Sequence, residues 1–552
     1  MAKAVDEAMR NCGLLVAEAG TGTGKTFAYL VPALLSGAKV IVSTGTKTLQ
    51  DQLFDRDIPT VRAALHVPVS TALLKGRGNY VCHYHLDRAR SEGRFASREA
   101  ARQLHAIAAF ARRTRSGDKS ELAEVPEDAP IWAQVTSTRE NCLGSECPRY
   151  RDCFVMEARR RAMEADVVVV NHHLFFADVV LRDEGAGELL PAANAIILDE
   201  AHQLPDTASL FFGESVSTAQ LLELARDARV AAMAHARDFA PLPEAVQVLE
   251  KAARDLRLEC GEVPGRVPAK AMAGNAGFAT AIGGAREALE RLAERLASQA
   301  ERHLDIDNCH SRALALTERV QRWTDGASDE RVRWVEVFSQ SAALNSTPLS
   351  VASIFRTQLD AGNRAWIFTS ATLSVGDDFS HFCSRMGLDD ATTVRWESPF
   401  DFEQQALLYL PRGMPDPNTA GYTAAVIQAA LPLIRAAGGR AFCLFTSLRA
   451  MREAHRLLSD AFAAAGLDYP LLAQGQGSRS ELLERFRALG NAVLVGSHSF
   501  WEGVDVRGDA LSLVVIDRIP FSPPDDPVLA ARIEALEREG GSGFLDYQLP
   551  EA

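Results

Sequence analysis

Short apolar runs that alternate with helical stretches recur along the chain and predict the buried strands of a parallel α/β sheet. The first such runs are Leu14–Val16, Lys39–Thr44, Asp166–Val170 and Ala195–Leu198. Most of these runs end in polar or small residues. In open α/β sheets, ligands bind at the carboxyl ends of the strands, so these polar residues mark the edge where a ligand site is expected.

The pattern continues beyond the middle of the chain and predicts a second α/β domain. Arg364–Thr372 is a further strand that ends in small hydroxyl residues, and the proline-rich passage Pro411–Pro417 after it is the best candidate for a linker. The strands expected after the linker are Arg440–Phe445, Ala492–Val495 and Leu511–Ile516. The second series contains no glycine-rich phosphate loop.

A long interval separates the two strands that end at Leu198 and Thr372. The 167 residues between His202 and Ser370 are too many for one strand–helix unit, and much of this interval has helical spacing. Leu289, Leu292 and Leu296 fall on one face of a helix whose other face is charged. We expect an inserted helical domain here, from which Trp334–Phe338 returns as a strand toward the core.

A glycine-rich turn lies between the first strand and the first long helix. Backbone N–H groups of such a turn can surround a polyphosphate, and the positive end of the helix dipole adds to the attraction. Lys25 is expected to reach the β- and γ-phosphates and Thr26 to bind Mg²⁺. The first glycine of the usual pattern is replaced by Ala19. The residues expected to bind the nucleotide are Ala19, Gly20, Thr21, Gly22, Thr23, Gly24, Lys25 and Thr26.

Two carboxylates follow the apolar run Ala195–Leu198. Placing Asp199 and Glu200 at the end of a buried strand is costly unless they hold a cation or a polarised water. With a phosphate loop upstream, we expect Asp199 to bind Mg²⁺ through water. Glu200 is then expected to orient and deprotonate the water that attacks the phosphate.

Four cysteines fall in one polar segment, Cys82 first and then Cys142, Cys147 and Cys153 in a C-x₄-C-x₅-C arrangement. Clustered thiolates in a reducing compartment usually bind metal. The spacing is looser than that of structural zinc knuckles, whereas an iron–sulfur cluster accepts longer loops. An iron–sulfur cluster, a zinc ion and unrelated buried cysteines all remain open on the residues alone. Nearby Arg159, Arg160 and Arg161 suit single-stranded nucleic acid or a solvated helix face equally.

Composition limits the class of protein. The chain has 552 residues, enough for about three or four domains, and a formal net charge of −13, so any nucleic-acid contact must use local basic patches. Its nine cysteines are scattered and do not form a disulfide framework. Neither a signal peptide nor an apolar run near the roughly 18 residues of a membrane span is visible. We expect a cytoplasmic protein without membrane contact.

Together these stretches resemble the XPD/DinG-type superfamily 2 iron–sulfur helicases, and most closely the bacterial YoaA branch of the DinG family. The motifs that carry the resemblance are Glu18–Thr26, Ser43–Leu53, Lys75–Cys82, the three later cysteines, Asn171–Leu174, Asp199–His202, Thr369–Thr372 and Phe500–Asp505. The resemblance covers nearly the whole chain. The cysteine quartet between two ATPase motifs is its most specific part.

The family implies an ATP-dependent DNA helicase that uses ATP and Mg²⁺ and moves 5′→3′ along single-stranded DNA to unwind duplexes in repair or replication-fork rescue. It implies a 4Fe–4S cluster on Cys82, Cys142, Cys147 and Cys153. It adds His202 to the catalytic residues Lys25, Asp199 and Glu200, and it adds Glu502 and Asp505 to the nucleotide-binding residues. The implied partners are single-stranded and forked DNA and possible replication or repair proteins, with the helicase itself a monomer.

The fold implied by the resemblance is α/β, with two RecA-like P-loop motor domains, the first interrupted by an iron–sulfur domain and a helical arch domain. Motor domain 1 is expected in three parts, at 1–74, 163–205 and 351–398. The iron–sulfur domain occupies 75–162 and the arch 206–350. Motor domain 2 is expected at 399–552, truncated before its final helicase motif.

The sequence departs from the family pattern at both ends. A glutamine-containing stretch that reads adenine would precede Met1, and a Gln-Gly-x-Gly-Arg-x-Ile-Arg stretch would follow Ala552. The second stretch supplies an arginine that stabilises charge on the transferring phosphoryl group. The expected alternative is therefore a nucleotide-binding, DNA-binding fragment without turnover. A zinc-bearing P-loop ATPase acting on proteins or metabolites is a further reading.

Overall fold

The computed structural model describes residues 1–92, 97–183, 185, 187–326, 328–497, 500–501, 504, 506 and 508–552. The chain divides into two compact units. The first contains Met1–Pro399 and Pro523–Gly543, and the second contains Phe400–Ser522 and Phe544–Ala552. Residues 523–543 therefore return to the first unit, an excursion that the expected continuous domain from 399 to 552 does not include.

The first unit is built on a seven-stranded sheet in which every neighbouring pair of strands is parallel. Its order is β11 (Thr392–Trp396), β1 (Leu14–Ala19), β10 (Ala365–Ser370), β5 (Ala195–Asp199), β2 (Val40–Thr44), β4 (Val167–Asn171) and β3 (Thr71–Leu73). The strands expected from the apolar runs are confirmed.

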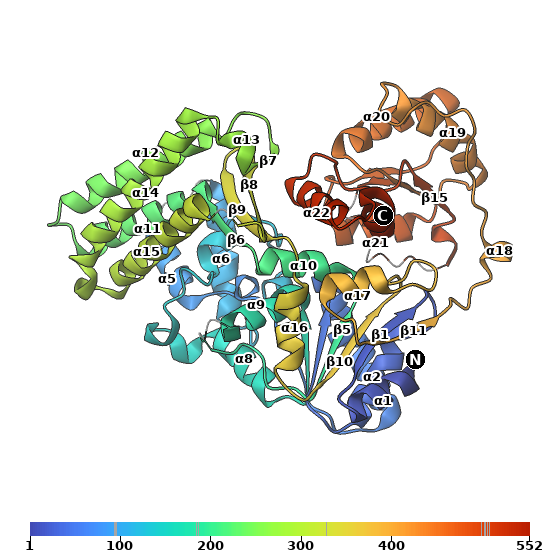
Figure 1. Ribbon diagram of the computed structural model, residues 1–552, viewed down its shortest axis with the longest axis horizontal. Coiled ribbons are helices and arrows are strands. Elements are labelled where there is room, and N and C mark those ends of the chain that lie inside the picture. Colours follow the sequence, from blue (N-terminus) through green and yellow to red (C-terminus); the bar gives the residue numbers. More distant parts are fainter. Residues whose placement is uncertain are drawn as a thin grey trace. The chain divides into compact units, whose positions relative to one another are not determined.

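Helices cover both faces of this sheet, because alternate strand residues point to opposite faces. One face packs against α1 (Ala2–Arg10), α2 (Lys25–Leu35), α3 (Lys47–Gln52) with the π-turn after it, and α4 (Ile58–Leu65). The other face packs against α8 (Phe154–Glu164), α9 (His172–Asp183), α10 (Leu204–Phe211), α16 (Ala352–Asp360) and α17 (Ser380–Met386). Figure 1 shows this sheet in its lower half, between α16 and α17 on one side and α1 and α2 on the other. This three-layer arrangement fixes the strand ends that form the site.

The segment between β3 and β4 carries the four clustered cysteines and has a core of its own. Its helices before α8 are α5 (His83–Glu92), α6 (Arg98–Ala111) and α7 (Trp132–Val135). Ile107, Trp132 and Val135 are buried at the centre of this core. The segment is thus a folded insertion in the sheet domain and does not simply connect two strands.

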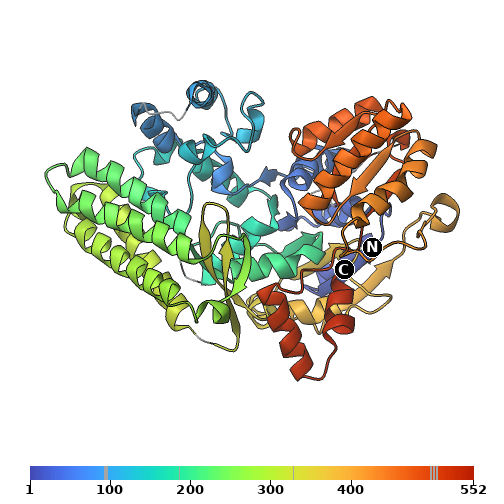
Figure 2. The same cartoon turned by 90° about the horizontal axis from the view of Figure 1, so that it is seen from above.

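A second insertion, between α10 and α16, is mainly helical, as expected. Four helices lie side by side (Figure 1, Figure 2): α11 (Thr218–His235), α12 (Pro241–Glu259), α14 (Ala276–Ala297) and α15 (Leu304–Asp325). Leu289, Leu292 and Leu296 are fully buried in their core, which confirms the apolar face.

The helical insertion also contains an antiparallel sheet that corrects one expectation. Its order is β6 (Glu214–Ser217), β9 (Ala342–Pro348), β8 (Arg331–Val337) and β7 (Gly265–Pro268), and the short helix α13 (Ala269–Met272) follows β7. The run Trp334–Phe338 does not return to the main sheet, because β8 pairs with β7 and β9. A single apolar run indicates a strand but does not identify the sheet that the strand joins.

The second unit has a four-stranded parallel sheet in the order β13 (Leu471–Ala473), β14 (Val493–Gly496), β12 (Ala441–Leu444) and β15 (Leu513–Ile516). One face packs against α19 (Tyr422–Ala436) and α20 (Leu448–Ala465), and the other packs against α21 (Arg479–Leu489). The short helices α18 (Phe402–Gln405) and α23 (Leu549–Glu551) lie near its two chain ends, and residues 406–421 contain neither helix nor strand.

The excursion 523–543 contains α22 (Pro527–Arg538), which packs within the first unit. Asp526 accepts the first backbone N–H groups of α22 and pairs with Arg266 Nη1 of β7 at 2.6 Å. Arg532 Nη2 donates to Ser209 Oγ of α10 at 2.7 Å, and its Nε donates to the Leu349 carbonyl at 3.1 Å. The helix thereby joins α10 to the sheet of the helical insertion.

Candidate nucleotide site and cysteine cluster

The glycine-rich turn connects the carboxyl end of β1 to the first residue of α2, as the sequence predicts. Gly22 and Gly24 have φ angles of 85° and 75°, in the left-handed region that glycine adopts without strain. At Gly20 the reason for glycine is different, because a Cβ atom there would lie 2.7 Å from the Ser398 backbone nitrogen. Ser398 Oγ also donates to the Thr21 carbonyl at 2.6 Å, which holds the turn from outside.

Lys25, the first residue of α2, lies between the two acidic residues that end β5. Its Nζ is 2.9 Å from Glu200 Oε1 and 3.3 Å from Asp199 Oδ1. Burial lowers the pKa of Lys25, but the two carboxylates outweigh this effect and the net pKa is raised. The structure therefore brings together the three residues expected to act on the phosphates, although they come from distant parts of the sequence.

Asp199 is 4% exposed, and its carboxylate has one neutral and one charged neighbour. Oδ2 accepts a hydrogen bond from the Tyr29 hydroxyl at 3.2 Å. Oδ1 makes no hydrogen bond of good geometry, so its contact with Lys25 is an ion pair. Burial raises the pKa of Asp199 to about 6 despite Lys25. A buried carboxylate oxygen without a donor, beside a phosphate loop and the Thr26 hydroxyl, fits an oxygen-liganded divalent cation such as Mg²⁺.

His202 connects Glu200 to the neighbouring strand β10. Its Nδ1 forms a hydrogen bond of 2.7 Å with Ser370 Oγ, and Ser370 Oγ in turn donates to Glu200 Oε2 at 3.4 Å. Glu200 itself has a φ of 55°, an uncommon conformation for a residue other than glycine. The Glu200 side chain is therefore held by groups from β10 and from the turn after β5. Ser370 is a site residue that the expected catalytic set does not include.

Glu18 is a second residue of this edge to which the sequence assigns no role. It is 7% exposed in β1, where an acidic side chain needs partners. Its Oε2 accepts backbone N–H groups of Leu373 and Ser374 at 2.6 and 2.7 Å, and its Oε1 pairs with Arg395 Nε of β11 at 3.0 Å. Glu18 thus joins the loop after β10 to β11 beside the glycine-rich turn. An acid inside an apolar strand is the signal that could have identified it.

His172 follows β4 and is 1% exposed, with its Nδ1 2.8 Å from Ser43 Oγ of β2. Burial lowers the pKa of His172 to about 3, from 6.5 in the unfolded chain. Between these pH values the unfolded chain binds a proton that the folded protein does not. The free energy of unfolding therefore falls as the pH drops below about 6.5 and is not affected by this group above it.

We expect His172→Gln to make the unfolding of the first unit less dependent on pH. Near neutral pH its stability should be lower, because a buried group is replaced. Between pH 4.5 and 6.5 the slope should decrease by up to about 1.4 kcal/mol per pH unit, the value for one proton. Urea unfolding at several pH values measures this slope. His105→Gln, at an exposed histidine of α6, is the control. Identical slopes for His172→Gln and the parent would contradict the assignment.

The four clustered cysteines are partly buried and lie close enough for their charges to interact. Burial chiefly, with smaller effects of Cys147 and Cys153, raises the pKa of Cys82 to about 11. Cys82 precedes α5 and its sulfur accepts backbone N–H groups of Tyr84 and His85. Cys153 likewise precedes α8. Helix N-termini favour thiolates, which is the form that binds metal.

The spacing of these sulfurs distinguishes two kinds of metal centre. A single tetrahedral zinc needs thiolates about 3.8 Å apart, as follows from Zn–S bonds of about 2.3 Å. Within the part of the chain that the structure describes, the cysteine sulfurs form no group of three within 4.8 Å of one another. A cubane cluster binds each thiolate through a different iron and accepts a wider set. As placed in the structure, the four sulfurs therefore do not form the compact tetrahedron of a single zinc site.

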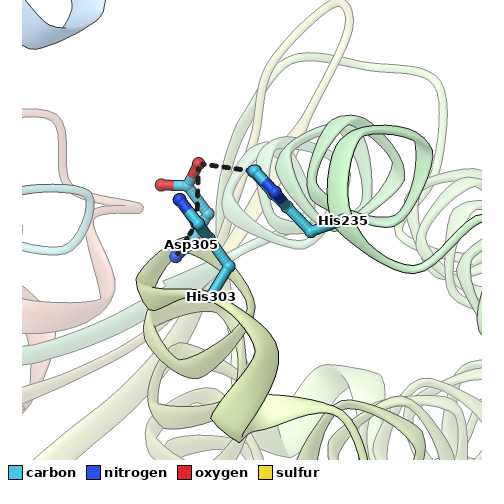
Figure 3. A group of neighbouring side chains, drawn as sticks. All are labelled: His235, His303 and Asp305. Atoms are coloured by element: carbon cyan, nitrogen blue, oxygen red, sulfur yellow. Dashed lines mark hydrogen bonds and ion pairs between the residues drawn. The ribbon is translucent and has the colours of Figure 1, made fainter.

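His235, His303 and Asp305 are the described group whose ligand atoms do lie within 4.8 Å (Figure 3). The two imidazole rings are stacked, with centroids 3.6 Å apart and planes inclined by 5°. A nitrogen lone pair lies in the plane of its ring, so one ion cannot lie in both parallel planes. The Asp305 carboxylate also accepts the Tyr84 hydroxyl of α5 at 2.5 Å. This group therefore fits a packing contact between the two insertions and does not fit a metal site.

The structure describes only some of the other residues expected to contact nucleotide or DNA. Glu502 and Asp505 lie outside the described residues. Arg160 and Arg161 both pair with Glu157 within α8, and Arg159 donates to the Glu188 carbonyl, which is the arrangement of a solvated helix face. No helix among the described residues is long and apolar enough to cross a membrane.

Comparison with known proteins identifies relatives over the whole chain. The helicase C-terminal domain family matches residues 430–552. ATP-dependent DNA helicase YoaA of Escherichia coli (strain K12) is 44% identical, over 100% of this chain and 86% of that protein. ATP-dependent helicase DinG of Mycobacterium tuberculosis is 35% identical, over 99% of this chain and 84% of that protein.

Solved structures agree on the fold. The match to the structure of an XPD helicase covers 97% of this chain and 86% of that chain, with 16% identity and a TM-score of 0.56. The structure of Xpd4 of S. tokodaii gives a TM-score of 0.53 at 12% identity and covers 99% of this chain and 88% of its own. With the nucleotide-type site at the strand ends and this similarity along its length, the chain belongs to the family of YoaA and DinG ATP-dependent helicases.

Proposed function

We propose that this protein is an ATP-dependent DNA helicase that hydrolyses ATP to move 5′→3′ along single-stranded DNA and to unwind duplexes in repair or replication-fork rescue. The observation that carries the proposal is the contact of Lys25 Nζ with both Asp199 and Glu200 at the carboxyl end of the parallel sheet. The relatives in Escherichia coli and Mycobacterium tuberculosis, named as ATP-dependent helicases, support it.

The contacts of the site indicate what each residue does when ATP binds. The phosphate loop offers backbone N–H groups between Thr21 and Lys25, whereas the Gly20 N–H donates to the Trp396 carbonyl at 2.9 Å. The Lys25 ammonium moves from its carboxylate partners to the phosphates. The Glu200 carboxylate, relieved of this ion pair, can accept a proton from the attacking water. Ser370 and His202 keep Glu200 oriented through the contacts described above. The residues of this unit thereby hold the reactants and provide the base.

The residues that would hold Mg²⁺ are Thr26, through its hydroxyl, and Asp199, through water. Mg²⁺ held there would neutralise negative charge that develops on the phosphates. These ligands suit Mg²⁺, since both groups offer oxygen and the Asp199 Oδ1 atom accepts no hydrogen bond of good geometry.

We further propose that Cys82, Cys142, Cys147 and Cys153 hold a 4Fe–4S cluster in an iron–sulfur domain at 75–162, and that 206–350 forms an arch over the DNA path. The separate core of the cysteine segment and the four-helix insertion support this division. The cluster would hold together the two ends of a long loop, because Cys82 lies directly before α5 and Cys153 lies directly before α8. Single-stranded and forked DNA are the proposed partners.

Lys25→Ala tests the proposal directly. Charge-assisted hydrogen bonds contribute ~1.5–3 kcal/mol each, so we expect affinity for ATP–Mg²⁺ to fall about 10- to 100-fold. DNA-stimulated phosphate release and strand separation should fall with it. Lys251→Ala, at an exposed residue of α12, should behave as the parent protein. Unchanged nucleotide affinity in Lys25→Ala, or a parent protein that does not bind ATP–Mg²⁺, would contradict the proposed function.

A further inference from the structure

Tyr29 is a buried polar residue next to the nucleotide site that the proposed mechanism does not use. It is fully buried on α2, in the core between this helix and the sheet, beside apolar residues of β1 and β2. A phenylalanine would fill the same space without a polar group. Burying a hydroxyl costs free energy unless it is hydrogen-bonded, so the partners of this hydroxyl are informative.

The Tyr29 hydroxyl contacts one of the two residues proposed to hold Mg²⁺. It donates to Asp199 Oδ2 at 3.2 Å. Tyr29 also lies one turn after Thr26, the other proposed ligand, on the same face of α2.

This hydrogen bond restricts Asp199 on one side. With Oδ2 held by Tyr29, the free positions of the carboxylate are those of Oδ1, which faces Lys25 at 3.3 Å on the phosphate-loop side. One buried hydroxyl of α2 thus sets the orientation of the carboxylate at the end of β5.

We propose that Tyr29 is the positioning residue for the magnesium site of this ATPase, holding Asp199 in the orientation that accepts the ion. The inference rests on the proposed function, because it concerns the Mg²⁺ that accompanies the nucleotide. Groups that orient metal ligands from outside the coordination shell typically account for 10- to 100-fold in metal affinity, roughly the effect expected here.

Tyr29→Phe tests this inference, because it removes one oxygen and keeps the ring. The probe is the fluorescent nucleotide mant-ADP, titrated at a series of Mg²⁺ concentrations and also in EDTA. We expect the Mg²⁺ concentration for half-maximal enhancement of binding to rise by about 10-fold or more. Affinity in EDTA should stay within about twofold of the parent, since the phosphate loop is unchanged.

Tyr80→Phe is the matched control. Tyr80 is 4% exposed, and its hydroxyl accepts the Lys75 backbone N–H at 3.0 Å, so this change also removes one buried hydrogen bond, in the cysteine segment. It should leave the Mg²⁺ requirement unchanged. Far-UV circular dichroism and the melting temperature show whether either variant is misfolded.

The outcomes separate the inference from the function on which it rests. An unchanged Mg²⁺ requirement in Tyr29→Phe overturns the inference alone. Equal losses with Mg²⁺ and in EDTA also overturn it, since they indicate a general packing role. If the parent itself binds mant-ADP without any Mg²⁺ enhancement, the proposed magnesium-dependent ATPase is wrong, and the inference falls with it.

Discussion

Glu200→Gln should lower DNA-stimulated ATP hydrolysis by about 10²–10⁴-fold, the usual contribution of a general base. The amide keeps the shape of the side chain and can still accept the hydrogen bond from Ser370, but it cannot take a proton from water. Binding of ATP–Mg²⁺ should remain or become tighter, because Lys25 loses one of the two carboxylates that hold it away from the phosphates. Phosphate release and nucleotide titration of the same preparation measure both quantities.

The comparison needs a glutamate that lies far from the site. Glu287 is exposed on α14, so Glu287→Gln should hydrolyse ATP at the parental rate. A Glu200→Gln protein with parental hydrolysis would show that another group is the base. A parallel loss of binding and turnover would show that Glu200 acts through the fold of the site and has no chemical role.

Cys82→Ser should lower the iron content of anaerobically purified protein from about four atoms per chain to near zero. Cys82 is the proposed ligand most remote in sequence, and in this proposal metal–thiolate bonds close the loop to Cys142. Loop closure costs only about 0.6 kcal/mol more for each doubling of length, so the bonds can offset it while all four thiolates are present. A serine hydroxyl at this position is a poor ligand for iron, and the cluster should be lost.

Iron and acid-labile sulfide are measured together with ATP binding and strand separation. Strand separation should be lost with the cluster, whereas ATP binding should persist, because the cysteine segment has its own core and only α8 of this segment packs on the sheet. Cys12→Ser, at a partly exposed cysteine after α1, should retain iron and sulfide. Stoichiometric zinc without sulfide, in parent protein prepared with iron available, would contradict the cluster assignment.

The main strands and the phosphate site could be predicted from the sequence because each depends on a local signal. The apolar run before Asp199 predicts β5, and the glycine spacing before Lys25 predicts the turn. Both predictions depend on neighbouring residues and little on contacts between distant parts of the chain. Short strands such as β3, β11 and β13 carry weaker signals. Three to five residues give too short a pattern, and these strands lie at the edges of their sheets.

The supporting residues of the site could not be predicted in the same way. Glu18, Tyr29 and Ser370 are each defined by a partner more than a hundred residues away. Their roles depend on which strands are neighbours in the sheet. Local sequence patterns do not show that order. For the same reason the run at Trp334 predicts a strand, but the expected sheet is wrong. The pairing of this strand with β7 and β9 forms only when the insertion folds.

The excursion 523–543 has a consequence for how the polypeptide can be divided. Its helix α22 is part of the first unit, although it is encoded far beyond Pro399. A fragment ending at Pro399 would lack this helix and would expose the surface that Leu529 and Arg532 now cover. After a single proteolytic cut within residues 406–421, the carboxyl-terminal piece would still contain a helix embedded in the amino-terminal piece. The two products should therefore remain associated until the protein is denatured.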